Sequence, residues 1–205
     1  AEEAEPLLRD AVDILLELHG PVSVQTAAAL TNLGHSLVAL ERYEEAETAY
    51  LDGREVFVTT FGAEHPYPGV SDSYLGRLYV EWGRYRDAEA RLSQGERLLE
   101  AVFPAAADRL ARCHVWQARL YLATDRAEEA AAIAEGALAI LEEQGGHEAW
   151  DPPEVRAVLG ACRARLGNPE GRGQLAQAYR ELLDLGRGAD PLTRWAGREL
   201  DRLAS

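Results

Sequence analysis

The apolar residues of the chain recur at helical spacing, in segments separated by short polar or glycine-containing breaks. In the clearest segment they lie three or four positions apart, at Ala27, Leu30, Leu33, Gly34, Leu37 and Leu40. After a break at residues 41–43 the same spacing continues through residues 46–57. Residues three and four apart share one face of an α-helix, so each segment predicts an amphipathic helix. The sequence has no sustained alternation of apolar and polar residues, which is the usual signal for strands.

These helical segments recur with a step of 42 residues. The step relates Arg42-Tyr43-Glu44-Glu45-Ala46 to Arg84-Tyr85-Arg86-Asp87-Ala88 and to Arg126-Ala127-Glu128-Glu129-Ala130. It also aligns Gly34, Gly76, Ala118 and Gly160, and a set of turn residues at Gly20, Gly62, Pro104, Gly146 and Gly188. We therefore predict an internal repeat of helix, tight turn, helix and loop.

The recurring small residues predict where helices approach each other most closely. Glycine in a helix interior costs about 1 kcal/mol relative to alanine, so a repeated glycine needs a compensating contact. We expect Gly34, Gly76 and Gly160 to lie at tight crossings between paired helices. In the last copy Arg172 stands where the earlier copies have alanine, so we expect this copy to depart from the pattern.

The repeat also predicts the organisation of the chain as a single array over residues 1–205. We expect the second helix of a truncated repeat at 2–20, four repeats at 21–62, 63–104, 105–146 and 147–188, and a capping helix at 189–205. In the capping helix we expect an apolar side that includes Leu192 and Trp195, and a polar side formed by Arg194, Arg198, Glu199, Asp201 and Arg202. The first helix lacks its partner, so we expect the natural protein to continue before residue 1. Its apolar edge also leaves room for self-association.

The aligned positions resemble the tetratricopeptide repeat. Leu33-Gly34, Ala46, Tyr50 and Gly53 match its pattern in the first copy, and Leu75-Gly76, Tyr79, Ala88 and Gly95 match it in the second. The family's usual repeat has 34 residues, and the longer step here is similar to the kinesin-light-chain type and to arrays in bacterial multidomain regulators. The resemblance implies an all-α fold, a right-handed α-α superhelix of about four helix pairs with a leading half-repeat and a capping helix. It also implies a surface on which the first helix of each pair lines a concave groove.

The composition narrows the range of functions that the protein can have. The 205 residues carry a net charge of −14, which argues against nucleic acid and anionic membranes as partners. The five histidines and two cysteines form no metal-binding or nucleophile motif, so we expect no enzyme activity, no cofactor and no metal site. Two cysteines also form no disulfide framework, which favours a reducing compartment and a cytoplasmic protein.

The groove positions that the resemblance implies differ in charge from the rest of the chain. Their charged residues are Arg77, Arg112, Arg119, Arg165, Glu81 and Glu154, which give a net charge of +2, against −16 for the remainder. His35, Arg77 and Arg119 share one repeat position and should form a ladder along the groove, with Tyr74 and Trp116 beside it. The candidate partner-binding residues are Asn32, His35, Tyr74, Arg77, Arg112, Trp116 and Arg119.

Arginine beside aromatic rings is suited to an acidic peptide, because the guanidinium orients carboxylates and the rings give apolar contact. We therefore expect a non-catalytic scaffold that binds a peptide or protein segment in its groove. The alternative is an intramolecular regulatory segment of a larger bacterial signalling protein, such as a Ser/Thr kinase, without an independent ligand.

Overall fold

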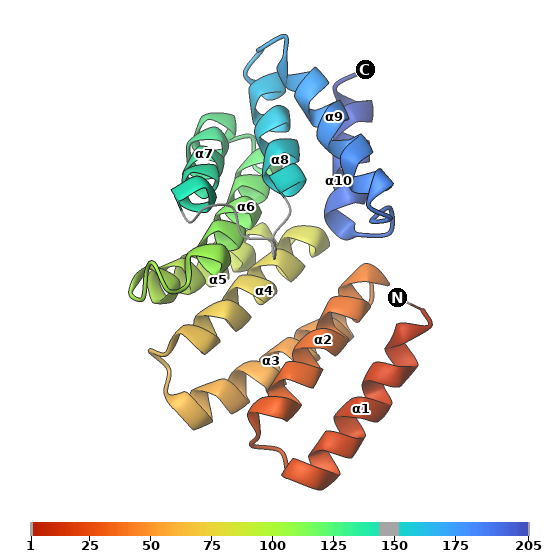
Figure 1. The fold of residues 1–205 in the computed structure, drawn as a ribbon, viewed down its shortest axis with the longest axis vertical. Helices are drawn as coiled ribbons and strands as arrows, with labels where there is room; N and C mark the ends of the chain where they lie inside the picture. Colours follow the sequence, from red (N-terminus) through yellow and green to blue (C-terminus); the bar gives the residue numbers. More distant parts are fainter. Residues whose placement is uncertain (1, 144–151, 205) are drawn as a thin grey trace. The chain divides into compact units, whose positions relative to one another are not determined.

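The computed structural model describes residues 2–143 and 152–204. Gly146, the turn residue predicted at the end of the third copy, and His147, with which the fourth copy begins, lie outside the described residues. All regular structure in the described ranges is helical, as Figure 1 shows. The helices are α1 (Ala4–His19), α2 (Val24–Ala39), α3 (Tyr43–Phe61), α4 (Pro66–Trp82), α5 (Tyr85–Glu100), α6 (Ala107–Ala123), α7 (Ala127–Glu143), α8 (Pro152–Arg165), α9 (Gly171–Asp184) and α10 (Pro191–Arg202).

The chain divides into two compact units, Ala1–Pro104 and Ala105–Ser205, called unit 1 and unit 2 below. In unit 1, α2 packs on α3 and α4 on α5. In unit 2, α6 packs on α7 and α8 on α9, and α10 packs on both α9 and α8. The predicted all-α fold of consecutive helix pairs is confirmed. The single array over residues 1–205 stays a prediction.

The turns between paired helices share one backbone geometry at a step of 42 residues. The residues with left-handed backbone are Glu41, Gly83, Asp125 and Gly167, with φ between 58° and 79°. The next N–H donates back to a carbonyl five residues earlier in every copy, as from Arg84 to Tyr79 at 2.8 Å. This helix-ending pattern satisfies carbonyls that the helix leaves unpaired, so it sets the path between the two helices of a pair.

The glycines predicted at tight crossings lie there. A Cβ on Gly34 would come within 2.5 Å of the Tyr50 ring, and one on Gly76 within 2.4 Å of Leu92. At Gly160 it would lie 2.5 Å from the backbone nitrogen of Leu175. Real side chains do not tolerate such approaches, so the absence of a Cβ is what lets the paired helices pack so closely. The prediction for these three glycines is confirmed.

The fourth helix pair keeps the close packing in a different register. Ala46, Ala88 and Ala130 are fully buried in the first three pairs. Arg172, which the step of 42 aligns with them, is exposed, and its neighbour Gly171 takes the small position, where an added Cβ would be 2.3 Å from the Ala164 nitrogen. The repeat step of 42 residues therefore misplaces the small position of this copy by one residue.

A buried carboxylate connects the two helix pairs of unit 1. Asp72 on α4 is 0% exposed and accepts two hydrogen bonds from Arg54 of α3, at 2.8 and 3.0 Å. It accepts a third from Arg91 of α5 at 2.8 Å. Nearby, Tyr79 donates to Glu47 at 2.5 Å, and burial followed by this bond raises the pKa of Tyr79 to about 12. Asp72 thus holds three consecutive helices together.

Helix α1 exposes part of its apolar surface. Leu7, Ile14 and Leu18 are 70%, 55% and 70% exposed, and their spacing places them on one stripe of the helix. Val12 is buried on the side that packs on α2. This stripe is the exposed apolar surface of α1, and self-association through the N-terminal edge stays a prediction. None of the helices in residues 2–143 and 152–204 combines the length and apolarity that crossing a membrane requires.

The two thiols should be unreactive while the protein is folded. Cys113 and Cys162 are both 0% exposed, and burial raises the pKa of Cys162 to about 12, so its thiolate is scarce at pH 8. We expect neither thiol to be alkylated by iodoacetamide at pH 8 on the timescale on which both react in urea. Mass spectrometry of the quenched reaction would measure this, and native labelling at the rate of the denatured control would contradict the burial of both side chains.

Candidate functional site

In unit 1 the candidate residues come from the first helix of each pair. Asn32 and His35 lie on α2, and Tyr74 and Arg77 lie on α4, which is in contact with α2. Asn32 is exposed, whereas the other three side chains are half-buried. Gly34 and Gly76 on the same two helices face α3 and α5, so the candidate residues lie beside the crossings of the helix pairs.

Three rings meet on this face. His35 Nδ1 lies 2.6 Å from the hydroxyl of Tyr50, whose ring fills the space beside Gly34. The Tyr74 ring packs edge-on against His35 at 4.4 Å between centroids and stacks on Tyr50 at 5.9 Å. The helix crossing at Gly34 therefore also shapes the site. The space beside Gly34 accommodates the Tyr50 ring, which contacts both His35 and Tyr74.

Arg77 influences the ionisation of the Tyr50 phenol in this ring cluster. Burial raises the pKa of Tyr50 well above its usual value of 10, and the positive charge of Arg77 acts in the opposite direction. The Tyr50 phenol therefore stays neutral and keeps its hydrogen bond with His35. The face of α2 and α4 combines a guanidinium, an imidazole and the half-buried ring of Tyr74, which suits carboxylates flanked by apolar groups. We call this set of residues (Asn32, His35, Tyr74, Arg77) the unit 1 face.

In unit 2 the candidate residues are less accessible. Arg112 on α6 is half-buried, whereas Trp116 and Arg119 on the same helix are only 6% and 2% exposed. The Arg119 guanidinium lies 4.9 Å from the ring centre of Trp195 on α10. Here a position predicted to line an open groove is covered by another helix of the same chain.

A second arginine of unit 2 also contacts α10. Arg165, at the end of α8, donates from Nε to Glu199 at 2.5 Å and approaches Asp125 at 3.4 Å. Glu199 is 6% exposed, so its assignment to the polar side of the capping helix is wrong. The signal in the sequence was its position: Glu199 follows Trp195 by four residues and Leu192 by seven, within the apolar stripe.

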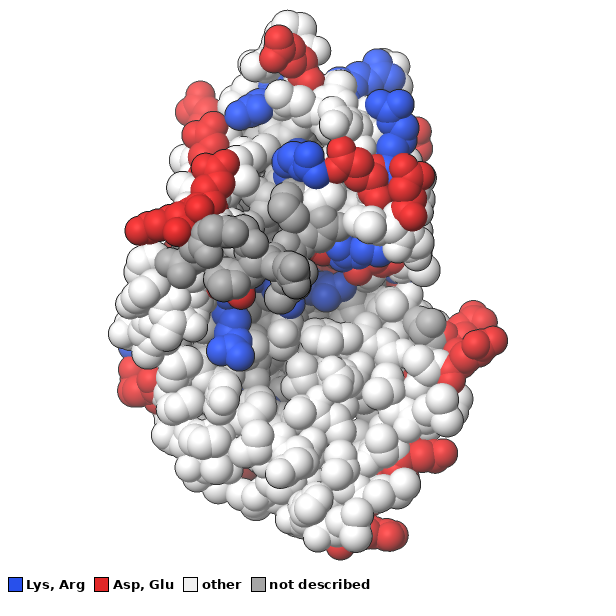
Figure 2. Space-filling model, in the orientation of Figure 1, with Lys and Arg blue, Asp and Glu red and all other residues white. Residues whose placement is uncertain are grey.

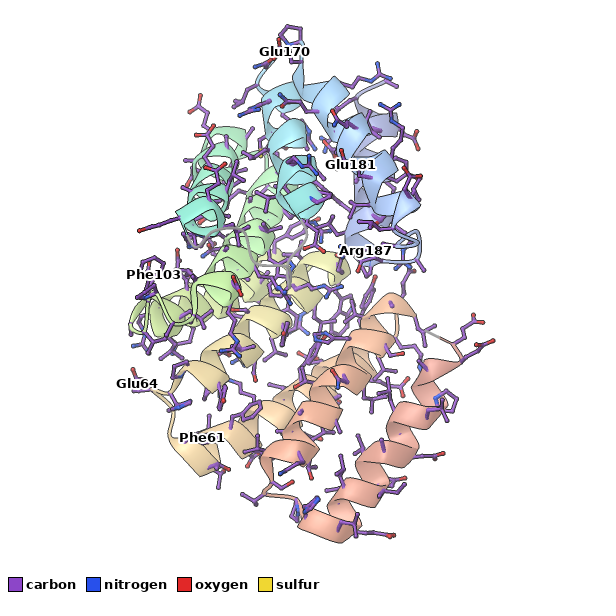
Figure 3. The ribbon with its side chains drawn as sticks, in the orientation of Figure 1. Phe61, Glu64, Phe103, Glu170, Glu181 and Arg187 are labelled. Atoms are coloured by element: carbon purple, nitrogen blue, oxygen red, sulfur yellow. The ribbon has the colours of Figure 1, made fainter. Side chains whose placement is uncertain are left out.

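The turn that leads into α10 is attached to α8. Arg187 lies in the turn after α9 (Figure 3) and donates to Glu154, with Asp190 at 3.6 Å. Burial raises the pKa of Glu154, while the positive charges of Arg187 and Arg112 oppose that shift. Glu154 was also a groove position implied by the resemblance, so one more charged side chain of this surface is paired within the chain.

Charge is unevenly distributed over the surface shown in Figure 2. Acidic side chains follow α7, whose exposed glutamates are Glu128, Glu129, Glu135, Glu142 and Glu143. In unit 1, the surface over α2 that Figure 2 shows presents few charged side chains. The acid excess of the chain therefore lies largely outside the helices that carry the candidate arginines. The ladder of His35, Arg77 and Arg119 spans both units and stays a prediction.

Comparison with known proteins agrees with this architecture. A family model described as tetratricopeptide repeat matches residues 1–57 and 27–101. The crystal structure of BtubC (BKLC) from P. vanneervenii is similar over 90% of this chain and 74% of that one, with a TM-score of 0.65 and 20% identity. A kinesin-light-chain-type protein of Podosopora anserina with nearly identical TPR-like repeats is similar over 86% of this chain and 84% of that one, with a TM-score of 0.60 and 19% identity. No curated protein matches the sequence.

Residues 1–101 therefore match the tetratricopeptide repeat, and the described helix pairs have the fold of solved kinesin-light-chain-type repeat structures. The family model covers unit 1, and the similar structures extend the fold into unit 2. Tetratricopeptide repeats are protein–protein interaction scaffolds and generally lack catalytic activity. The fold thus defines the class of protein. The kind of segment that it binds is inferred from the charges and rings of the faces described above.

Proposed function

We propose that this protein binds an acidic segment of another protein on the unit 1 face. The observation that supports the proposal is the cluster of His35, Tyr74 and Arg77, in which two rings in contact lie beside a cation on neighbouring first helices. A carboxylate of the ligand would pair with Arg77 and His35, and apolar side chains would lie against Tyr74. Because the whole chain has a net charge of −14, a cation on the face of α2 and α4 distinguishes this face from most of the surface.

The test uses the full chain and a defined probe, a fluorescent peptide of alternating glutamate and leucine about ten residues long. Anisotropy titration should show binding to the unchanged protein that weakens about tenfold or more in Arg77→Glu, because the substitution replaces attraction by repulsion at the carboxylate. The same peptide with glutamine in place of glutamate should bind about tenfold less tightly than the acidic one.

Arg86→Glu is the matched control. Arg86 is exposed on α5, the second helix of its pair, so this variant makes the same charge change away from the unit 1 face. We expect it to change the affinity by less than about twofold, in line with a distant and screened charge. Equal losses in Arg77→Glu and Arg86→Glu, or equal binding of the acidic and amide peptides, would refute the proposed face. Circular dichroism of both variants confirms that the helices are retained.

A further inference from the structure

Helix α10 contacts α6 and α8 with an aromatic ring and a carboxylate, the same groups that we propose for an external ligand. Its inner side places Trp195 over Arg119 and Glu199 against Arg165. Both arginines belong to first helices, α6 and α8, at positions that the repeat assigns to the groove. We propose that α10 is a displaceable self-ligand, and that this surface of unit 2 recognises a helix that carries an aromatic residue and a carboxylate four positions apart. The inference deepens the proposed function, on which it rests, by naming the kind of partner that unit 2 accepts.

The two contacts are polar and largely shielded from solvent. The side chains of Arg165 and Glu199 are 15% and 7% exposed, and the hydrogen bond that Arg165 donates to Glu199 raises the pKa of Arg165 further above its usual value. Arg119 is 2% exposed beneath the Trp195 ring. An arginine–aromatic contact and an arginine–carboxylate pair, one helical turn apart on α10, make the docking specific for that spacing.

The apolar part of the docking is small. Leu192 and Ala196 are buried on α10, whereas Leu200 and Leu203 are only half-buried. The Thr193 hydroxyl is buried and makes no hydrogen bond within the described part of the chain. A buried hydroxyl without a partner destabilises the docked state relative to one in which it is hydrogen-bonded. A helix that supplies a better residue at this position would compete with α10.

Helix α10 has its own start signals and a separate attachment. The Asp190 side chain accepts from the Leu192 N–H at 2.8 Å, and Pro191 occupies the first turn. The preceding turn is held to α8 by Arg187 and Glu154, independently of the docked side of α10. A helix of 12 residues is marginal in isolation, so release of its docked side would also loosen the helix. Displacement therefore needs no change in α8 or α9.

A peptide of residues 189–205, added to the full chain, tests the proposal. In the unchanged protein α10 occupies its own surface and should exclude the peptide. Glu199→Gln weakens the docked helix but leaves the surface intact, so we expect labelled peptide to bind this variant at least about tenfold more tightly than the unchanged chain. Adding Arg165→Gln should remove that gain, because the peptide's own Glu199 then loses its partner.

Asp201→Asn is the matched control, since it also turns one carboxylate of α10 into an amide. Asp201 is exposed, so its variant should bind the peptide as weakly as the unchanged chain does. If Glu199→Gln and Asp201→Asn behave alike, or if Arg165→Gln leaves the gain in place, the self-ligand proposal is refuted. Every protein in this series keeps Arg77, so a failed unit 1 assay with a successful peptide assay, or the reverse, identifies which proposal is wrong.

Hydrogen exchange of the unchanged protein gives a second readout that needs no variant. We expect the amides of α10 to exchange about a hundredfold faster than the buried amides of α8, because α10 opens without unfolding the helix pair. Exchange of α10 only together with α8 and α9 would mean that it is a fixed cap, which would overturn the proposal.

Discussion

Gly160→Ala should lower the free energy of unfolding of unit 2 by about 3 kcal/mol, at the upper end of overpacking effects. The added Cβ would lie 2.5 Å from the Leu175 nitrogen and 3.0 Å from the Gly171 oxygen. Both are backbone atoms of α9, so no side-chain rotation relieves the contact and the helices must separate. Denaturant unfolding followed by circular dichroism would measure the loss, together with exchange of the α8 and α9 amides.

Gly173→Ala provides the control in the same helix pair. Gly173 is exposed on α9, and a Cβ there would meet no atom within 4 Å. Because alanine is the better helix former, this variant should be more stable by up to about 1 kcal/mol. The same substitution thus has opposite signs at two glycines. Stabilisation, or no change, in Gly160→Ala would show that α8 and α9 do not cross as closely as described.

Asp72→Ala should destabilise unit 1 by about 3–4 kcal/mol, because removing one partner of a buried ion pair leaves the remaining charges without the carboxylate that they contact. Arg54 of α3 and Arg91 of α5, the two helices that pack on α4, would then lose the carboxylate between them, with side chains 24% and 33% exposed. The three hydrogen bonds that join α3, α4 and α5 would be lost together. Denaturant unfolding, with exchange of the α4 amides, would measure the effect.

Asp87→Ala is the comparison for an exposed pair. Asp87 accepts from Arg84 at 2.7 Å, but its side chain is 48% exposed, so the loss should stay within about 1 kcal/mol. A loss in Asp72→Ala no larger than in Asp87→Ala would mean that the buried carboxylate does not hold the helices together.

The sequence predicted the parts of the fold that depend on local patterns. The positions of the helices follow from the spacing of apolar residues, and the crossings follow from glycines that a helix interior otherwise disfavours. The turn geometry was less visible, because its left-handed position holds Gly83 and Gly167 in two copies but Glu41 and Asp125 in the others. The register of α9 depends on the turn that includes Pro169, which the repeat step alone does not describe.

The features that the sequence did not predict depend on contacts between distant residues. Asp72 is one of many acidic residues, and only the approach of Arg54 and Arg91 makes it structural. Glu199 was placed on the polar side of its helix by residue type, although its position follows the apolar stripe. Its partner Arg165 lies 34 residues earlier in the chain. Recognising the pair requires knowing that α10 packs on α8.

The most direct test of the account is to map the acidic peptide on the full chain by NMR. We predict that backbone and side-chain signals of Asn32, His35, Tyr74 and Arg77 shift on titration, and that signals of the exposed sides of α3 and α5 do not. The shifts should disappear when the peptide carries glutamine in place of glutamate. Shifts confined to α3 and α5, or none at saturating peptide, would contradict the proposal that the first helices of unit 1 form the binding face.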